Sequence, residues 1–427
     1  MDKKTFYIEN LGCAKNQVDA EVMANKLVKD GYVCINGAEN AAETADVIIV
    51  NTCAFIESAR KEAIDVFFTL NDAKKKGAKI IITGCLGERY KDELTKSLEE
   101  ADEIRGVPKV PSTTRGDVLF SPKGTAYLKI SEGCNHRCAF CAIPIIRGGL
   151  ASIDKDEILK EAKRLIKSGV KEINLIAQDL ASYGFDKGDF NGLQSLLKEL
   201  IKIDGDFKIR CLYIHPDFFK DEFIDIIKNS DGKIIPYFDI PIQHASESIL
   251  KAMGRVHNKS DYKKMVEKIR KNFEDSYVRT TFLIGFKGET EETLLELRDF
   301  IKDVKFDAAS FFEYSREEGT KGYKMVSKKE LDALKPLLRK YKKELEDLQD
   351  SISSERLERF KGTTQNIMIE EKIEGSNMYF AHAPFQCPDV DGTIVVTNKS
   401  GKDLEIGSIY KSVITGVNNL DLEARIE

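Results

Sequence analysis

Three cysteines lie within eight residues of this chain, at Cys134, Cys138 and Cys141. Thiolates this close together are better placed to hold one iron–sulfur cluster than to form disulfides. Three cysteines leave one iron of a cubane cluster without a protein ligand, and an open position is how a metal site binds a substrate. The alternative is a structural zinc site, but that needs a fourth ligand, and His136 inside the loop is poorly placed to provide it. The spacing therefore predicts a cluster with one open iron.

A second set of three cysteines is spread over the first hundred residues, at Cys13, Cys53 and Cys85. Each cysteine directly follows a segment that reads as a β-strand. In a parallel sheet the carboxyl ends of the strands share one edge, which is where open α/β folds bind ligands. Small cysteines also occur in cores and turns, but three at equivalent turns favour a second cluster.

Composition places the chain in a broad class. A length of 427 residues suggests about three domains. The sequence has neither a signal peptide nor an apolar run long enough to span a membrane, so we expect a cytoplasmic protein with no membrane partner. Nine cysteines in a reducing compartment argue for metal or redox work. The isolated Cys34, Cys211 and Cys387 are expected to be buried core residues.

The N-terminal third alternates β-branched runs with amphipathic helical patterns, which predicts an α/β domain with a parallel sheet. Its expected limits are residues 1–107, and residues 108–123, rich in Pro and Gly, are the expected linker. Strands are expected at 6–8, 47–50 and 79–83, and helices at 19–29, 57–76 and 90–100.

Residues 124–360 resume the alternation with six strand candidates. Six βα units are too few for a closed eight-fold barrel, so the pattern predicts an open (β/α)6 partial barrel. The first cysteine set falls in the loop after its first strand, at the end of the barrel where chemistry is expected. A trailing helix over 328–360 should be interrupted at Pro336. The strands are expected at 127–131, 172–177, 208–214, 234–240, 278–285 and 308–314, and the intervening helices at 155–167, 193–203, 218–228, 262–272 and 291–302.

Residues 361–427 read as a third domain with five short strands divided by Gly, Asn and Asp turns. This pattern of short strands and turns predicts a small five-stranded β-barrel of the oligonucleotide-binding kind. The strands are expected at 364–370, 379–382, 392–397, 409–414 and 421–426.

The chain resembles the radical S-adenosylmethionine (SAM) methylthiotransferase family over essentially its full length. The resemblance rests on Leu11–Asn16, Asn51–Cys53, Thr83–Cys85 and Cys134–Cys141. It implies an N-terminal domain with a second 4Fe–4S cluster, a central radical-SAM partial barrel and a C-terminal TRAM domain. Two departures, Ala14 in place of the usual proline and the lack of an arginine-rich pattern at 149–152, affect no cluster ligand.

The resemblance also implies a reaction, the conversion of a C–H bond into C–S–CH3. In the family, Cys134, Cys138 and Cys141 correspond to the ligands of the 4Fe–4S cluster that cleaves SAM to a 5′-deoxyadenosyl radical. Cys13, Cys53 and Cys85 correspond to those of the cluster that supplies or relays sulfur. SAM serves as both radical source and methyl donor, and an external donor supplies electrons.

Further SAM contacts are expected by resemblance from residues at the carboxyl ends of barrel strands. Each of these residues could instead have a purely structural role, such as a polar side chain that caps a strand end. For His244 the alternative is a buried histidine whose hydrogen bonds are satisfied within the fold. The sequence identifies no catalytic side chain beyond the cofactors. The expected SAM-binding residues are Phe140, Gln178, Gln243, Arg279, Ile284 and Gly285, with Asp179 beside them.

Two branches of the family differ in substrate. One modifies the β-carbon of an aspartate in small-subunit ribosomal protein twelve, and the other an adenosine derivative beside the tRNA anticodon. Residues 177–184, 239–246 and 388–392 resemble the ribosomal-protein branch.

Charge in the last domain supports the same branch. From residue 362 to the end, the sequence contains ten acidic and five basic residues, a net charge of −5. Such a surface repels phosphates and suits a basic protein loop, although acids on a small barrel also simply aid solubility. A non-catalytic iron–sulfur electron carrier is a further alternative, but complete cysteine ligation would be expected there, not two three-cysteine sites.

Overall fold

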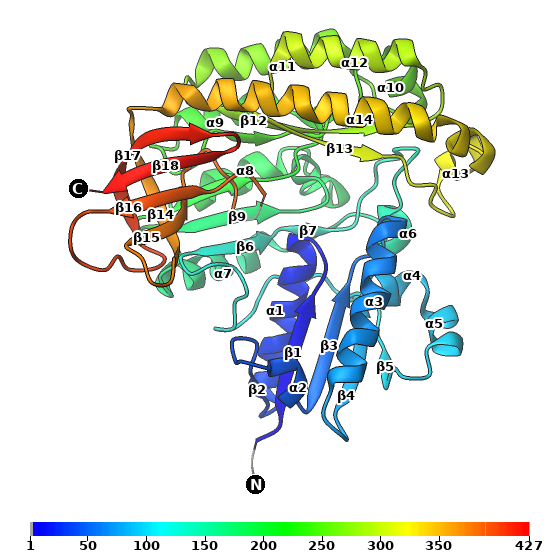
Figure 1. Cartoon of the computed structure of the whole chain (residues 1–427), viewed down its shortest axis with the longest axis vertical. Coiled ribbons are helices and arrows are strands. Elements are labelled where there is room, and N and C mark those ends of the chain that lie inside the picture. Colours follow the sequence, from blue (N-terminus) through cyan, green and yellow to red (C-terminus); the bar gives the residue numbers. More distant parts are fainter. Residues whose placement is uncertain (1–2, 389, 427) are drawn as a thin grey trace.

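The structure, a computed structural model, describes residues 3–388 and 390–426. Asp389, part of the 388–392 segment and of the charge count, lies outside this range, as do Met1, Asp2 and Glu427. The chain folds into an N-terminal α/β domain, a central half-barrel and a C-terminal β-barrel, as predicted (Figure 1). Within the described residues, no helix has the length and apolar character needed to cross a bilayer.

The N-terminal domain is built on a five-stranded parallel sheet in the order β2-β1-β3-β4-β5. Every residue of β3 is buried, as in parallel sheets covered on both faces. Separate apolar clusters pack under α1 and under α3. The elements are β1 (Thr5–Asn10), α1 (Ala14–Lys29), β2 (Val33–Cys34), α2 (Ala41–Thr44), β3 (Val47–Thr52), α3 (Glu57–Ala73), β4 (Lys79–Gly84), α4 (Cys85–Arg89), α5 (Lys91–Ser97) and β5 (Glu103–Ile104).

The central domain has six parallel strands in two three-stranded groups, β10-β9-β6 and β11-β12-β13. An isolated bridge between Ile209 and Ile234 and a hydrogen bond from the Ile214 amide to the Asp239 carbonyl (2.9 Å) connect the groups. The predicted open, six-stranded half-barrel is confirmed. Its strands are β6 (Thr125–Lys129), β9 (Glu172–Ile176), β10 (Lys208–Cys211), β11 (Tyr237–Asp239), β12 (Tyr277–Ile284) and β13 (Ala308–Glu313), with the short pair β7 (Ser131–Glu132) and β8 (Ala151–Ser152).

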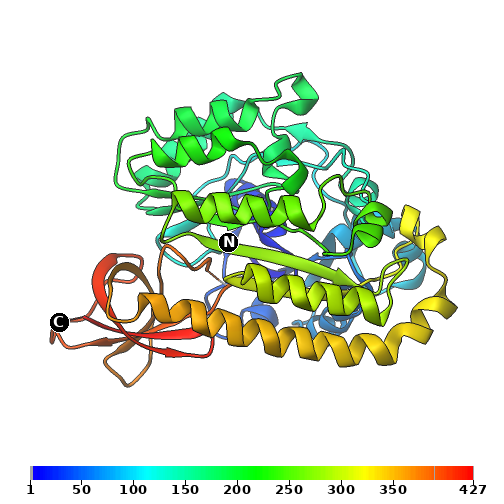
Figure 2. The same ribbon diagram turned by 90° about the horizontal axis from the view of Figure 1, so that it is seen from above.

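Helices cover the outer face of the half-barrel and complete its core. Long α14 runs along this domain and ends at the C-terminal barrel (Figure 2). The helices are α6 (Ile143–Ile146), α7 (Lys155–Lys167), α8 (Gly192–Leu200), α9 (Asp221–Lys228), α10 (Glu247–Met253), α11 (Lys259–Asn272), α12 (Glu291–Val304), α13 (Lys321–Met325) and α14 (Lys328–Leu357).

Four sequence expectations need correction. Cys34, expected to be buried in the core, is only half-buried because it lies in the edge strand β2. Helix α1 begins at Ala14, five residues earlier than predicted, because its first turn is polar and apolar periodicity does not reveal it. The helix expected over 90–100 is α5, which ends at Ser97, and a second short helix that was not predicted, α4, directly precedes it. The interruption predicted at Pro336 is wrong, since α14 continues through it, with a capping box at Ser327 and buried Leu338 beyond it.

The segment between the first two domains is packed against both of them. Arg115, within the expected linker, is buried and forms ion pairs with Glu21 of α1 (2.7 Å) and Glu161 of α7 (3.4 Å). This arginine therefore ties the segment to both domains.

The C-terminal domain is a closed barrel in the order β14-β15-β16-β18-β17, as predicted. Its strands are β14 (Thr364–Lys372), β15 (Met378–His382), β16 (Ile394–Asn398), β17 (Ile409–Asn418) and β18 (Asp421–Ile426).

Buried charges join this barrel to the central domain. Glu172 of β9 contacts Arg210 of β10 (3.0 Å) and His382 of β15 (3.4 Å). His382 also contacts Glu370 (2.7 Å), and Arg210 donates a hydrogen bond to the Pro384 carbonyl (2.8 Å). Removing one charged side chain from such a group leaves its partner as an uncompensated buried charge.

These contacts predict a pH window for the interface. Burial opposes the His382 cation, but Glu172 and Glu370 outweigh it and raise the pKa from 6.5 to about 9. Burial also opposes the Glu172 anion, but Arg210 and His382 outweigh it and lower the pKa from 4.5 to about 2. The stabilisation is therefore complete between pH 4.5 and 6.5, and is lost toward pH 9 and toward pH 2.

The measurement is thermal unfolding across pH for the parent chain and for His382→Gln. The difference in melting temperature should shrink as pH rises from 6.5 to 9. A difference that stays constant over that interval contradicts the assignment.

Candidate functional site

The three N-terminal cysteines meet at one edge of the parallel sheet. Cys13 caps the start of α1 after β1, Cys53 follows β3, and Cys85 opens α4 after β4. Strands β1, β3 and β4 are neighbours, so their carboxyl ends lie side by side. Glycine at position 84 allows the end of β4 to lie close to the end of β3. Its φ is +88°, and a Cβ there would lie 2.6 Å from the Thr52 carbonyl oxygen.

Asn16 connects these cysteines. Its side-chain oxygen lies 3.4 Å from Sγ of Cys13 and 3.9 Å from Sγ of Cys85, and its amide donates to the Thr52 carbonyl (2.9 Å). Asn51 in turn donates to the Asn16 backbone carbonyl (2.7 Å). The start of α1 is thus held against the neighbouring strand ends.

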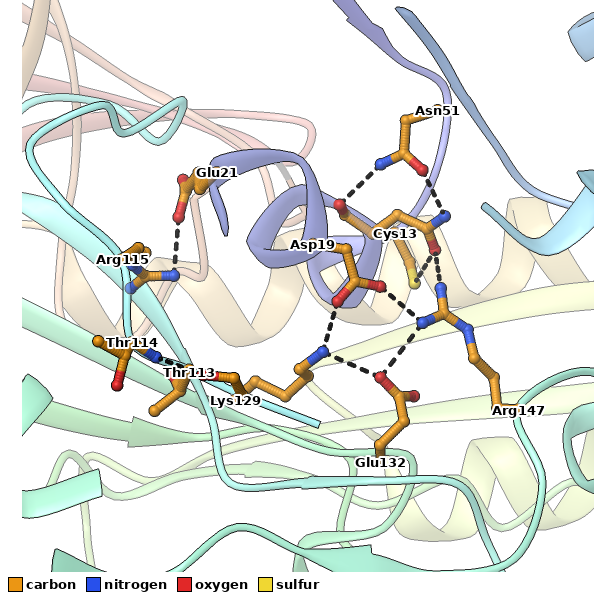
Figure 3. A network of polar contacts seen from close by, with 12 residues as sticks. Cys13, Asp19, Glu21, Asn51, Thr113, Thr114, Arg115, Lys129, Glu132 and Arg147 are labelled. Carbon is orange, nitrogen blue, oxygen red and sulfur yellow. Dashed lines mark hydrogen bonds and ion pairs between the residues drawn. The ribbon is translucent and has the colours of Figure 1, made fainter. Parts of the chain in front are cut away.

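A buried charge network links this edge to the half-barrel (Figure 3). Arg147, just after α6, contacts Asp19 of α1 (2.6 Å) and Glu132 of β7 (3.2 Å), and Lys129 of β6 contacts both acids. The other end of the Arg147 guanidinium donates to Asn16 Oδ1 (3.0 Å) and to Cys85 Sγ (3.3 Å). The two domains therefore share one set of charges at the cysteine edge.

The first cysteine set, Cys134, Cys138 and Cys141, lies in the loop that follows β6 and β7. His136, inside this loop, contacts Asp179 (2.7 Å), which also accepts a hydrogen bond from the His215 amide (2.9 Å). His136 is therefore turned toward Asp179, and among the described residues no three His, Cys, Asp or Glu side chains gather around a single ion. His215 places its Nε2 3.8 Å from Sγ of Cys138.

Burial raises the pKa of five of the six thiols, Cys53, Cys85, Cys134, Cys138 and Cys141, in the protein alone. Burial is the larger cause, and thiolates of the same set add to it; it raises the pKa of Cys53 and of Cys134 from 9.0 to about 11, and that of Cys141 to about 12. The pKa values of Cys85 and Cys138 are also raised, chiefly by burial.

The geometry agrees with both predicted sets: Cys134, Cys138 and Cys141 share one loop, and the N-terminal cysteines follow three neighbouring strands, where Asn16 contacts Cys13 and Cys85. Three thiols in one loop or at one sheet edge fit a cluster that keeps one iron open, and metal binding would release their protons.

Two of the expected SAM-binding residues line one cavity. Phe140 and Gln243 border a space of about 200 Å³ together with Leu283 of β12. Phe55, two residues after Cys53, lines the same space from the N-terminal domain. The cavity therefore lies between the two domains and adjoins both cysteine-bearing loops.

The other residues expected to contact SAM interact with protein groups outside this cavity. Their role in SAM binding stays a prediction. Gln178 donates a hydrogen bond to Glu132 of the charge network. Arg279 pairs with Asp391 of the C-terminal domain (2.8 Å) and donates to Ser310. Ile284 is buried in the core.

Gly285 and His244 have structural explanations. Gly285 has a φ of +86°, and a Cβ there would lie 2.7 Å from a methyl group of Leu338 in α14. His244 is fully buried, accepts a hydrogen bond from the Ser246 amide (3.0 Å) and lies 3.4 Å from Glu289. The plain reading of His244 as a structural histidine fits these contacts.

The acidic residues of the C-terminal domain divide into two groups. Asp391 is paired with Arg279 of the central domain, and Glu370 is paired with His382 of its own barrel. The exposed group is Glu371, Glu374, Asp403, Glu405, Asp421 and Glu423. Two of these, Asp403 and Glu405, are paired with lysines.

Models of known families match each of the three domains. The model described as the radical SAM superfamily matches residues 128–301, and that of the TRAM domain matches residues 362–426. Residues 5–106 match a family described only as uncharacterized protein family UPF0004.

Curated relatives match the whole chain. The proteins named ribosomal protein uS12 methylthiotransferase RimO from Thermotoga maritima and Clostridioides difficile are 37% and 39% identical to it, covering 97% of this chain and 98% and 97% of their own lengths. The protein of that name from Bdellovibrio bacteriovorus is 36% identical over 100% of this chain and 98% of its own.

Solved structures share the fold. The radical SAM methyltransferase TsrM from Kitasatospora setae, with cobalamin and a [4Fe-4S] cluster bound, aligns with a TM-score of 0.51 at 13% identity, over 73% of this chain and 75% of that one. The cobalamin-dependent radical enzyme OxsB aligns with a TM-score of 0.50 at 13% identity, over 79% and 56%. At these identities the likeness shows the fold alone.

The charge network yields a direct prediction. Replacing Arg147 with Met leaves two buried acids with one base, and breaking a buried pair in this way typically costs about 3–5 kcal/mol. We expect faster amide hydrogen exchange in α1 and β6 as the two domains separate. As a control, Lys263→Met removes an exposed ion pair with Asp303 and should leave the exchange unchanged. Equal exchange in the Arg147 variant and the parent would contradict the role of the network.

Proposed function

This chain belongs to the RimO family of ribosomal protein uS12 methylthiotransferases, and we propose that its substrate is an aspartate of uS12, whose β-carbon gains a methylthio group. It is a radical SAM transferase, and its cofactors are SAM and 4Fe–4S clusters. The observation that carries the proposal is the approach of two separate three-cysteine sets to one domain boundary. A methylthio transfer needs both a hydrogen-removing site and a sulfur site at the same substrate atom.

We assign Cys134, Cys138 and Cys141 to the cluster that binds SAM. Cys13, Cys53 and Cys85 would hold the second cluster. When bound, these groups supply the one-electron cleavage of SAM, the sulfur and the methyl group. An external donor supplies the electrons.

The protein's own residues position the reactants. Asp179 holds the Cys134 loop through His136, and the network around Arg147 holds the N-terminal cysteine edge against the half-barrel. Phe140 and Leu283 line the cavity between the domains and, with Phe55, help to exclude water from it.

A protein substrate is supported over tRNA by charge. Among its described residues from 362 on, the C-terminal barrel exposes six acids and four lysines, and this excess of acids favours a basic protein loop over a phosphate backbone.

Cysteine variants test the assignment. Changing Cys134, Cys138 or Cys141 to Ala should reduce SAM cleavage by at least about 100-fold, since outer-sphere changes alone reach that size at metal sites. Changing Cys13, Cys53 or Cys85 should preserve SAM cleavage but stop formation of methylthiolated uS12.

The assay follows 5′-deoxyadenosine by chromatography and the mass of uS12 in the same reaction. The control is Cys34→Ala, a half-buried cysteine of the edge strand β2, which should preserve both activities. Methylthiolated uS12 formed by the Cys53 variant would refute the role of the second set.

A further inference from the structure

The start of α1 carries a positive charge that the fold does not neutralise. Lys15 is 8% exposed, and its amino group lies 3.6 Å from the centre of the Tyr213 ring and 3.4 Å from the Ala177 carbonyl oxygen. Among the described residues no carboxylate lies within 4 Å of it, whereas Lys129 and Arg147 nearby are each paired with two acids. A buried cation without an anion is costly.

The helix itself makes this placement less favourable. Lys15 lies in the first turn of α1, where the helix dipole favours acids, and that turn contains none. Lysine there adds to the positive potential. This end of α1 is therefore suited to receive an anion.

The position is at the active end of the half-barrel. Ala177 follows β9 and Tyr213 follows β10, so the Lys15 amine lies at the carboxyl ends of two strands. Tyr213 adopts a φ of +63°, a strained conformation that non-glycine residues keep mainly at functional sites. Cys13 is close enough to raise the pKa of the Tyr213 phenol, although burial is the main cause.

Some of the residues around the amine are only partly covered by the rest of the protein. Cys13 is exposed, and Tyr213 and Gln178 are only half-buried. Asp239 is a competing acid that the charge of Lys15 reaches. Its carboxylate accepts a hydrogen bond from the Tyr213 amide (3.1 Å), and burial raises its pKa, which weakens it as a counter-ion.

We propose that Lys15, resting on the ring of Tyr213, binds the side-chain carboxylate of the substrate aspartate. The inference rests on the proposed function. The β-carbon that receives sulfur is bonded directly to this carboxylate, so the counter-ion of the carboxylate must lie beside the sulfur site. Lys15 is two residues from Cys13 and faces the half-barrel, which meets that requirement.

The test compares uS12 with a uS12 variant in which the target aspartate is asparagine. The parent enzyme should favour the aspartate form in kcat/KM by at least about tenfold. In Lys15→Met, kcat/KM for the aspartate form should fall by about 30-fold or more, as when one partner of a buried charge pair is lost, and the preference should disappear. Lys15→Arg should restore part of the preference.

Lys233→Met is the matched control. The Lys233 amine also donates to backbone carbonyls, of Ile201 and Ile203, and lies 5.0 Å from the centre of the Phe207 ring, but it precedes β11 at the opposite end of the strands. This variant should keep the aspartate preference of the parent.

Two results overturn the inference while the proposed function stands. One is an unchanged aspartate preference in Lys15→Met, including the case in which only the KM for SAM rises. The other is loss of iron from Lys15→Met and Lys15→Arg alike, which would make Lys15 a support of the second cluster. A parent enzyme that modifies neither form of uS12 rejects the proposed function, and the inference with it.

Discussion

The active site depends on a buried group of two acids and two bases at the boundary of the first two domains. Its members are Asp19, Lys129, Glu132 and Arg147. Buried ion pairs of this kind add little net stability compared with apolar packing, but they penalise any arrangement that separates the partners. Burial opposes the Glu132 anion, yet Lys129 and Arg147 outweigh it and lower the pKa from 4.5 to about 2. The group therefore acts as an orientation constraint.

That constraint brings two sheet edges together. The N-terminal sheet and the half-barrel each present cysteines at the carboxyl ends of their strands, and the network joins those ends through Asn16 and Cys85. The C-terminal barrel is attached to the same half-barrel by a different buried group, in which Glu172 contacts Arg210 and His382. Each domain thus meets the half-barrel through charges that are satisfied only in one arrangement.

Much of this could be predicted from the sequence, because apolar periodicity and cysteine spacing are local signals. Both triads, the open six-stranded half-barrel and the five-stranded C-terminal barrel follow from them. The early start of α1 was missed because its first turn is polar, and its partners, such as Arg147, lie more than a hundred residues away. The contacts of Asn16 and His215 were missed because their partners are distant along the chain and carry no local periodic signal. An acid such as Asp19 on a buried helix face was the one available signal.

The most direct test of the account is the intact mass of ribosomal protein uS12, measured with nucleoside analysis of tRNA, from cells with and without this gene. The account predicts that a methylthio mass increment disappears from uS12 alone when the gene is absent. Loss of the modification from tRNA, with uS12 unchanged, would contradict the proposed substrate and the carboxylate site at Lys15.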